Sequence, residues 1–572
     1  MQRIALLAAM GVGIGGVASL CAILFVDTVL WLNGATLVSP RARVSLEDRP
    51  WLLGAVTVLV PALGGLLTGL VVRYLVVERR SLGPADTIHA VQSSEPLPSV
   101  RSGLGATLAA ILSLGSGASV GQYGPMVYLG TLIGGLAVRL DLPVRNLRAI
   151  AIGCGVAAAI STAFNAPIAG LVFAHEVILR HYAMQAFAPV TVASACGYVL
   201  ANVVFERPPL FLVSFDGVAH GYEFALFAIE GLLCAGVAIL FMRLLLRGAT
   251  LAARTPWPAP LKPAFAGLVL GLVALWIPDV LGIGRETLRF ATIEEAFRLD
   301  ELMLILVAKL AVTVLCLAYG FVGGVFSPSL LIGILFGALF GGLVGELATA
   351  LGPFAVSHVV VYAICGMMAV ASPVIGAPLT TIIIVFELTR HYDLTIAAMV
   401  AVVFSNLVAY RVFGRSLFDE QLARRGFDLS AGRDEALLGS LRVSSVMRTD
   451  LPTACRGQTV AVVVRRLIEA QASECMLLDG RGVHLGTVRL GSLIDRPVDA
   501  LVEDYCNGDT LVFDDRTTLS EAMELLRGFI GEAVAVVSSV DGTLLGAAPE
   551  SAIIEAYLDR VRQLRREENE AP

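Results

Sequence analysis

The sequence contains few charged residues, and neither sign is in large excess. Asp, Glu, Lys and Arg make up 15% of the 572 residues, the formal net charge is -6, and 56% of the residues are hydrophobic. A chain without a basic excess lacks the electrostatic footprint of nucleic-acid binding, so we exclude a nucleic-acid partner. The mean hydropathy of +0.80 lies outside the usual range of soluble proteins and predicts that most of the chain lies in lipid.

Paired cysteines and catalytic motifs are also missing. The nine cysteines occur singly, without the paired spacing of a zinc site or a secreted disulfide framework, and we interpret them as packing residues. The sequence has no nucleophile and base pair, no phosphate-binding loop and no metal-ligand cluster. We therefore expect no enzyme activity and no cofactor.

Apolar runs fill most of residues 4–32 and 51–413, and glycine and proline interrupt many of them. The first run is too long for a cleaved signal peptide, so we interpret it as the first membrane helix. Several later runs are shorter than the roughly 20 residues that cross a bilayer. Broken helices at membrane depth are tolerated where protein buries them or where they line a water-filled path. Residues 1–426 are therefore predicted to form an all-α polytopic membrane bundle of broken and tilted helices that transports a solute.

Two loops in this region share one spacing of glycine and proline. The sequence GQYGP occupies residues 121–125 and GVFSP residues 324–328, and two further glycines follow each at the same distances. Each loop places a proline at the head of an apolar helix, whose first N–H groups have no carbonyl partner. Those amides and the positive end of the helix dipole can hold an anion without a charged side chain. Two such helix starts predict one shared anion site.

A second repeat supports the first. Ala166-Pro167 precedes Glu176 by the same step that separates Ala377-Pro378 from Glu387. The two halves are therefore interpreted as related copies, and inverted repeats are a common plan among transporters. Both glutamates are ionisable groups in apolar helices, which favours a functional role. The alternative is that each caps the free amides of a neighbouring broken helix.

The composition changes after about Phe427, where charges rise and no membrane-length apolar run remains. Helical and strand-like segments alternate twice, which predicts a tandem pair of small α/β modules over residues 427–572.

Basic residues follow the second long apolar run at Arg73, Arg79 and Arg80, and the last long apolar run at Arg411. By the positive-inside rule both flanks are cytoplasmic, so the C-terminal domain is expected on the cytoplasmic side of the cell membrane.

These loops, together with Phe164-Asn165-Ala166-Pro167 and Gly376-Ala377-Pro378-Leu379, resemble the CLC family of chloride channels and proton-coupled anion exchangers. The C-terminal part resembles the paired CBS domains of many CLC proteins. The resemblance implies the CLC fold of two inverted repeats and a homodimer in which each subunit encloses its own anion pathway. It also implies that Tyr123, Gly124, Val325 and Phe326 offer backbone amides to chloride or another small monovalent anion.

The sequence departs from the family at both proton stations. The family's gating glutamate is the third residue of its Gly-Arg-Glu-Gly-Pro loop, and Tyr123 stands at that position. A phenol with an ordinary pKa of about 10 stays neutral at physiological pH. The internal proton-transfer glutamate aligns with Val177. We therefore expect a passive anion channel without proton coupling, and the alternative is an anion/proton antiporter that uses a different path, through Glu176 or His175.

The remaining family positions predict an altered anion site. The coordinating serine aligns with Ser81 and the coordinating tyrosine with Phe418, so one hydroxyl donor is kept and one is lost. Tyr123 either turns its hydroxyl toward the anion or fills the vacated gate as a plug. In the CBS pair, the acidic residues that bind a nucleotide's ribose align with Ser492 and Ala552, and we expect weak or no nucleotide binding.

Overall fold

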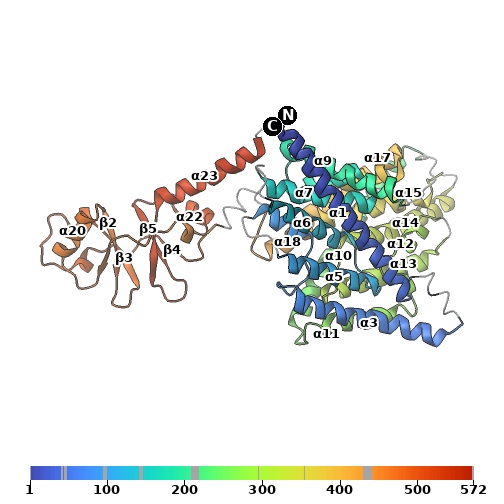
Figure 1. The fold of residues 1–572 in the computed structure, drawn as a ribbon, viewed down its shortest axis with the longest axis horizontal. Coiled ribbons are helices and arrows are strands. Elements are labelled where there is room, and N and C mark those ends of the chain that lie inside the picture. The colour runs from blue at the N-terminus through green and yellow to red at the C-terminus, as the bar shows by residue number, and fades with distance from the viewer. Residues whose placement is uncertain are drawn as a thin grey trace. The chain divides into compact units, whose positions relative to one another are not determined.

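The structure, a computed structural model, describes residues 2–39, 43, 48–93, 99–140, 146–207, 218, 220–293, 296–352, 355–429 and 441–569 (Figure 1). The chain divides into two compact units, Met1–Arg424 and Arg425–Glu570.

The described residues of the first unit form helices joined by turns and loops, with no β-strand among them. Its first half contains α1 (Gln2–Ala35), α3 (Pro50–Leu75), α4 (Pro84–Gln92), α5 (Val100–Gly115), α6 (Tyr123–Val138), α7 (Leu147–Phe164), α8 (Pro167–Phe173), the π-helical turn η1 (Ala174–Leu179), α9 (Met184–Tyr198) and the π-helical η2 (Val199–Val204). Its second half contains α10 (Glu223–Arg254), α11 (Leu261–Val273), η3 (Pro278–Val280), α12 (Arg285–Phe290), α13 (Leu299–Ala318), α14 (Phe326–Leu351), α15 (Val359–Ile375), α16 (Pro378–Thr389), α17 (Tyr392–Val412) and α18 (Leu417–Ala423).

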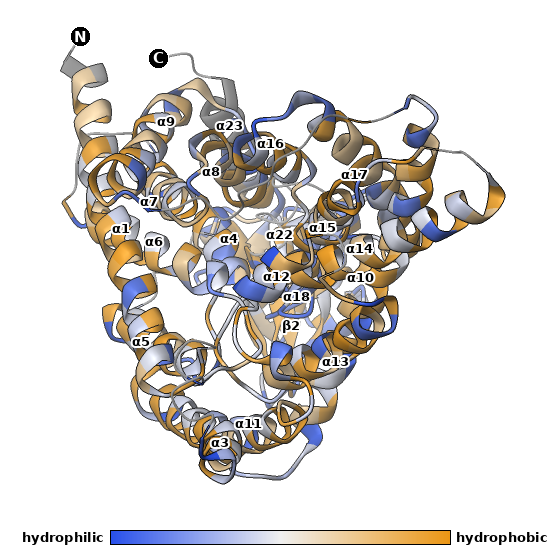
Figure 2. Cartoon of the chain, turned by 90° about the vertical axis from the view of Figure 1, so that its right-hand side faces the viewer, coloured by the Kyte–Doolittle hydropathy of each residue, from blue (hydrophilic) through white to orange (hydrophobic). Residues whose placement is uncertain are grey.

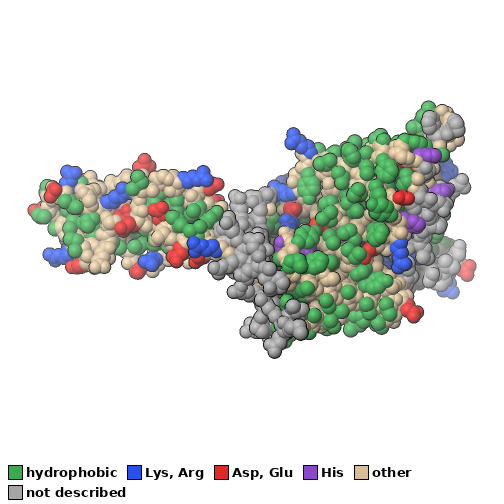
Figure 3. All heavy atoms as spheres, turned by 90° about the horizontal axis from the view of Figure 1, so that it is seen from above, with side chains coloured by type: hydrophobic (Ala, Val, Ile, Leu, Met, Phe, Trp, Pro, Cys, Tyr) green, Lys and Arg blue, Asp and Glu red, His purple; other side chains and the backbone are tan. Residues whose placement is uncertain are grey.

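Long and short apolar helices alternate in this unit, as the broken runs of the sequence predict. Within the described ranges, eight helices are long and apolar enough to cross a membrane, and six more apolar helices have only 10–17 residues. Hydrophobic residues colour most of the helical ribbon in Figure 2. Hydrophobic side chains also cover most of the face of this unit seen in Figure 3. These features define a multi-pass membrane protein.

The two halves repeat one set of helix neighbours. In the first half α1 packs on α7 and α9, and α6 packs on α7; in the second half α10 packs on α15 and α17, and α14 packs on α15. The corresponding helices α3 and α11 pack on each other and lie side by side in Figures 1 and 2. The repeat predicted from the two loops therefore extends over the whole helical unit.

Glycines allow the equivalent helices to cross at close range. A β-carbon on Gly130 of α6 would lie 2.4 Å from the carbonyl oxygen of Gly155 in α7, and one on Gly333 of α14 would lie 2.5 Å from that of Gly366 in α15. Neither crossing has room for a side chain. These contacts use the backbone to bring helices together where lipid provides no hydrophobic drive.

The second unit consists of two similar α/β modules. The first contains β1 (Thr453–Cys455), α20 (Val460–Glu469), β2 (Glu474–Leu478), β3 (His484–Arg489), α21 (Leu490–Leu493) and η5 (Val502–Tyr505). The preceding turn η4 (Val443–Ser445) packs with Val443 in the core of the second module. The second contains β4 (Val512–Asp514), α22 (Leu519–Leu525), β5 (Ala533–Val537), β6 (Leu544–Pro549) and α23 (Glu550–Asn569). In each three-stranded sheet the first strand pairs parallel to the middle strand and the last pairs antiparallel to it. The tandem α/β organisation predicted from the sequence is confirmed.

The two modules also share a contact. Each has its own apolar core, and a further buried cluster joins Met476 of β2 to Ala533, Ala535 and Ala547 of the second sheet. The buried carboxylate of Glu474 accepts hydrogen bonds from the backbone N–H groups of Glu532 (2.8 Å) and Ala533 (2.7 Å). The modules are therefore held together by both apolar packing and a carboxylate clamp.

Candidate anion site

The two glycine-proline loops meet at the centre of the helical unit. Gly121 N–H donates to the carbonyl of Gly324 at 2.8 Å, and Gly324 N–H donates to the carbonyl of Gly121 at 2.7 Å. A β-carbon on Gly324 would lie 2.6 Å from the amide nitrogen of Gly124. The meeting of the two helix starts that the repeated spacing predicts is therefore confirmed, and only glycine fits at the contact.

A third helix start lies beside this bridge. A β-carbon on Gly124 would contact Cδ of Pro84, the first residue of α4, at 3.6 Å. The amino termini of α4, α6 and α14 thus converge, and all three carry the partial positive charge of a helix dipole. Asp86 accepts a hydrogen bond from Gly83 N–H (2.9 Å) and pairs with Arg80 (2.6 Å), so the loop before α4 has a fixed shape.

Ser81, the retained hydroxyl donor, and Phe418, where the second donor is lost, lie on segments next to this convergence. Ser81 is exposed in the loop before α4, and the residue after it, Leu82, is buried in an apolar cluster with Val76, Ala106 and Tyr128. Phe418 is buried on α18, which packs against α4 and α15. The structure therefore brings Tyr123, Gly124, Val325 and Phe326 together and places the other two predicted residues on the elements next to them.

Tyr123 is enclosed by aromatic rings. Its side chain is 3% exposed, and its ring stacks on Phe164 with 4.0 Å between centroids and 23° between planes. Phe326 meets the Tyr123 ring edge-on at 5.3 Å and lies 5.1 Å from Phe164. Phe173 of α8 completes the group at 6.4 Å from Phe326. This aromatic cluster fixes the ring at the start of α6, since each such pair contributes about 0.5–1.5 kcal/mol beyond burial alone.

Glu176 and Glu387 form a pair of reciprocal helix caps. Glu176 Oε1 accepts from Leu379 N–H at 2.9 Å, and its Oε2 accepts from Thr380 N–H at 2.8 Å and from the Thr380 hydroxyl at 2.6 Å. Glu387 accepts from Ile168 N–H at 2.8 Å and from Ala169 N–H at 2.7 Å. Each half therefore caps the other half's short proline-headed helix. Both carboxylates have the capping geometry that was the alternative to a functional role.

His175 and Val177 flank Glu176 and point into packed surroundings. His175 is fully buried, its Nδ1 lies 2.7 Å from the carbonyl oxygen of His181, and its ring stacks on Tyr182. Nε2 of His175 has no hydrogen-bond partner in the described part of the chain. The hydrocarbon side chain of Val177 is 2% exposed. This packing is typical of a structural histidine beside an apolar residue.

Three residues near the site were not singled out from the sequence. Phe164 was noted for its motif, but its stacking on Tyr123 depends on a tertiary contact. Lys309 of α13 is fully buried and donates to the carbonyls of Val280 and Gly282, each at 2.9 Å. Arg285 lies within electrostatic range of Tyr123. A lone basic residue in an apolar run is the only sequence signal for Lys309.

Arg285 also lines a large cavity. The cavity has a volume of about 590 Å³, and polar groups on its wall come from Asn33, Arg43, Asp279, Arg285 and Glu286. The Nε of Arg285 is buried without a hydrogen-bond partner among the described residues. The two arginines on this wall are balanced by two acids, so the cavity is polar without a net excess of positive charge.

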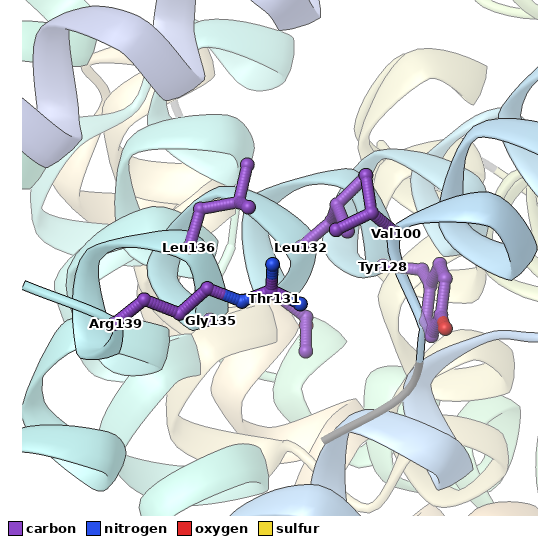
Figure 4. A pocket seen from close by; sticks show the side chains of 7 residues that line it. All are labelled: Val100, Tyr128, Thr131, Leu132, Gly135, Leu136 and Arg139. Atoms are coloured by element: carbon purple, nitrogen blue, oxygen red, sulfur yellow. The ribbon is translucent and has the colours of Figure 1, made fainter.

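A much smaller pocket lies along α6 and is separate from the helix starts. Figure 4 shows the side chains of Val100, Tyr128 and Arg139 around it, and its volume is about 20 Å³. The space is sufficient for about one water molecule. The buried hydroxyl of Tyr128 has no hydrogen-bond partner in the described ranges, which makes Tyr128 a useful reference for Tyr123 on the same helix.

In this protein, the helix starts of two inverted repeats meet at a buried centre. This arrangement places it in the class of membrane proteins that pass anions. The family model described as "Voltage gated chloride channel" matches residues 64–410. The chain belongs to this family, the CLC family of chloride channels and chloride/proton antiporters.

Individual relatives agree with this assignment. A ClcB-like chloride channel protein of Ralstonia nicotianae is 29% identical over 403 residues, which cover 70% of this chain and 91% of the relative. Chloride channel protein CLC-f of Arabidopsis thaliana is 30% identical over 314 residues, 51% of this chain and 39% of that protein.

Solved structures share the fold. A slow cyanobacterial Cl⁻/H⁺ antiporter matches with a TM-score of 0.66 at 22% identity, over 73% of this chain and 97% of the other. A eukaryotic CLC transporter matches with a TM-score of 0.65 at 20% identity, over 96% of this chain and 99% of the other. The second match extends the likeness over nearly the full length.

Proposed function

We propose that this protein is a passive chloride or small-anion channel without proton coupling. The observation that carries the proposal is the side chain at the start of α6, where Tyr123 is buried in the aromatic cluster beside the bridged loops. A phenol is neutral at physiological pH. It can neither compete with an anion as a carboxylate does nor deliver a proton at each cycle.

Val177, which stands where the family has its internal proton-transfer glutamate, also supports a channel without proton coupling. Val177 has no ionisable group, and Glu176 beside it is engaged by three donors from α16. A carboxylate that satisfies two backbone amides of a helix start is costly to protonate, because those amides then lose a charged acceptor. Glu176 therefore acts as a cap rather than as a proton carrier.

Two substitutions distinguish the role of the Tyr123 ring from the role of its hydroxyl group. Tyr123→Phe keeps the ring that stacks on Phe164 and removes the hydroxyl, whereas Tyr123→Ala removes both. A hydroxyl that coordinates the anion makes the phenylalanine variant bind more weakly, because a dehydrated anion that loses a donor in a low-dielectric site is destabilised by roughly 1–3 kcal/mol. A ring that only plugs the path makes the alanine variant faster and leaves the phenylalanine variant unchanged.

The test is flux from proteoliposomes, followed by chloride and pH electrodes, first under a chloride gradient and then under a pH gradient. Chloride movement without proton movement is expected. Proton uptake driven uphill by chloride would refute the passive channel. Nitrate and bromide are measured beside chloride, since the changes at Ser81-Leu82 and Phe418 alter the donor set. Tyr128→Phe is the matched control, because it removes a buried hydroxyl from the same helix.

We also propose a homodimer with the C-terminal unit in the cytoplasm. The capped starts of α8 and α16 carry exposed apolar side chains, Ile168 and Leu379, which are 49% and 53% exposed in the single chain. Apolar side chains at the capped starts of α8 and α16 are suited to packing against a second copy of this chain. Crosslinking of single cysteines at these two positions in membranes tests the contact. Loss of crosslinking on dilution into lipid would contradict a stable dimer.

The C-terminal unit is proposed to be structural and not nucleotide-binding. A cavity of about 200 Å³ lies between its sheets, lined in part by Arg448, Met476 and Gly546. Ser492 and Ala552 replace the acidic residues that hold a ribose, and the Ser492 hydroxyl donates to the carbonyl of Arg489 at 2.7 Å. Calorimetry with ATP and AMP on the full chain is expected to give no saturable heat. Tight binding would overturn this assignment.

A further inference from the structure

A buried carboxyl group without an ordinary hydrogen bond lies in the second half of the helical unit. Glu230 is the eighth residue of α10 and has no exposed surface, and neither side-chain oxygen makes a hydrogen bond of ordinary geometry among the described residues. The backbone N–H of Gly366 is the one donor that favours its charged form. An ionised carboxylate in such surroundings is far more costly than a neutral one. A neutral, protonated Glu230 therefore fits these surroundings better than an ionised one.

The surroundings of Glu230 are made of closely packed backbone. A β-carbon on Gly337 of α14 would lie 3.0 Å from Oε1 of Glu230, and one on Gly366 of α15 would lie 2.8 Å from the same atom. The carboxyl group thus fills the space where α10, α14 and α15 cross, three helices that lie together in Figure 2. No space remains there to hydrate a charge without moving a helix.

Packing alone does not require an acid at this position. Gly231 of α10 contacts Ala401 of α17, as Gly15 of α1 contacts Ala193 of α9. The residue before Gly15 is Ile14, which is also buried. The first repeat therefore fills the equivalent position with a hydrocarbon side chain, and the glutamate is a specific departure from the repeat.

The groups that face Glu230 define its electrostatic surroundings. On α10 the neighbouring titratable group is Cys234, and on α15 the groups are Tyr362 and Cys365. Glu223 of α10 is linked to this set through its hydrogen bond with Tyr362. The described parts of α13, α14 and α17 bring no charged group that interacts with Glu230. In the described part of the chain, no cation offsets a negative charge on Glu230.

Glu223, on the same helix, has a carboxylate whose oxygens are hydrogen-bonded. It lies seven residues earlier, and its carboxylate accepts from the Tyr362 hydroxyl (2.8 Å), from Ser357 N–H (2.8 Å) and from the Ser357 hydroxyl (3.0 Å). The contrast between a fully partnered Glu223 and a Glu230 without an ordinary hydrogen bond, about 10 Å further along α10, singles out Glu230.

We propose that Glu230 is a proton-binding site outside the anion pathway, and that its protonation sets the rate of anion passage. Release of the proton to water leaves a carboxylate that forces the crossing of α10 with α14 and α15 to open or to admit water. Gly337 lies eleven residues after Phe326 on α14, about 16 Å along the helix from the bridged loops. A shift of α14 at this crossing is transmitted along a rigid helix to Val325 and Phe326.

This inference rests on the proposed anion flux, but its first test does not need flux. Infrared spectra of the purified protein, titrated over pH, report the carbonyl stretch of a protonated carboxylic acid. The wild type is expected to show a band at neutral pH that Glu230→Gln lacks. A band that is identical in both proteins would overturn the proton-binding site, whatever the flux assay gives.

The second test compares the pH dependence of chloride flux in proteoliposomes. Glu230→Gln mimics the neutral acid, and Glu230→Ile introduces the residue type of the first repeat. Both variants are expected to lose the pH dependence. At every pH they should show the flux that the wild type shows at low pH. Glu346→Gln, which changes an exposed acid on α14, is the control and should follow the wild type. Variants that keep the wild-type pH profile would refute the proposal.

Discussion

The reciprocal caps of Glu176 and Glu387 lead to a quantitative prediction about stability. Glu176→Gln and Glu387→Gln each keep one accepting oxygen and replace the other with an NH₂ group that faces a backbone N–H donor. Each carboxylate accepts two backbone hydrogen bonds of 2.7–2.9 Å. A hydrogen bond to a charged group contributes about 1.5–3 kcal/mol, so losing one and weakening the other costs on the order of 2–4 kcal/mol.

The two substitutions are not expected to be equal. Glu176 also accepts the Thr380 hydroxyl at 2.6 Å, whereas no side-chain donor to Glu387 is present in the described ranges. Glu176→Gln should therefore destabilise the protein more, by about 1 kcal/mol. Thr380→Val removes the hydroxyl, and the two glutamine variants should then differ less.

Thermal unfolding in detergent, followed by intrinsic fluorescence, measures the effect. Both glutamine variants should unfold at lower temperature than the wild type, and Glu346→Gln on the exposed side of α14 should not. If both cap variants unfold at the same temperature as the wild type, the reasoning is refuted, because the first amides of α8 and α16 would then have found other acceptors.

Three further predictions concern other parts of the chain. Gly324→Ala should abolish flux, because its β-carbon would lie 2.6 Å from a backbone nitrogen, while Gly345→Ala, where nothing lies within 4 Å, should be silent in the same liposome assay. Glu474→Gln should loosen the module contact by roughly 2–3 kcal/mol, measured as faster hydrogen exchange in β5; unchanged exchange would exclude the carboxylate clamp. Burial lowers the pKa of His484, whose Nε2 has no partner in the described ranges, so the folded unit binds a proton less readily than the unfolded chain. Its stability should fall as pH drops below about 6.5, and His484→Asn should remove part of this dependence in limited proteolysis of the full protein.

The helical fold could be predicted because its main signals are local. The spacing of glycine and proline in 121–125 and 324–328 predicted that two helix starts meet, and the Gly121–Gly324 bridge confirms it. The equal steps from Pro167 to Glu176 and from Pro378 to Glu387 indicated a repeat. Backbone turns and helix starts depend on a few consecutive residues, so a sequence displays them directly.

The side-chain surroundings could not be predicted in the same way. Glu230 appears in the sequence as one acid in a long apolar run, and only the crossing with Gly337 and Gly366 shows that it lacks an ordinary hydrogen bond. The stacking of Phe164 on Tyr123 joins residues 41 positions apart. The sequence also left two roles open for Glu176, and the geometry of α16 is what favours the cap. Such features depend on which helices lie next to one another.

The backbone bridge between Gly121 and Gly324 limits which parts of this protein can move. A transporter that alternates by tilting one half against the other needs a seam between the halves that separates in each cycle. Here the seam carries two backbone hydrogen bonds at its centre and four more amide contacts at the α8–α16 caps. Breaking them together would expose six backbone donors at membrane depth, where each costs several kcal/mol. We therefore expect the two halves to stay joined while anions pass, with motion confined to single side chains and single helix crossings.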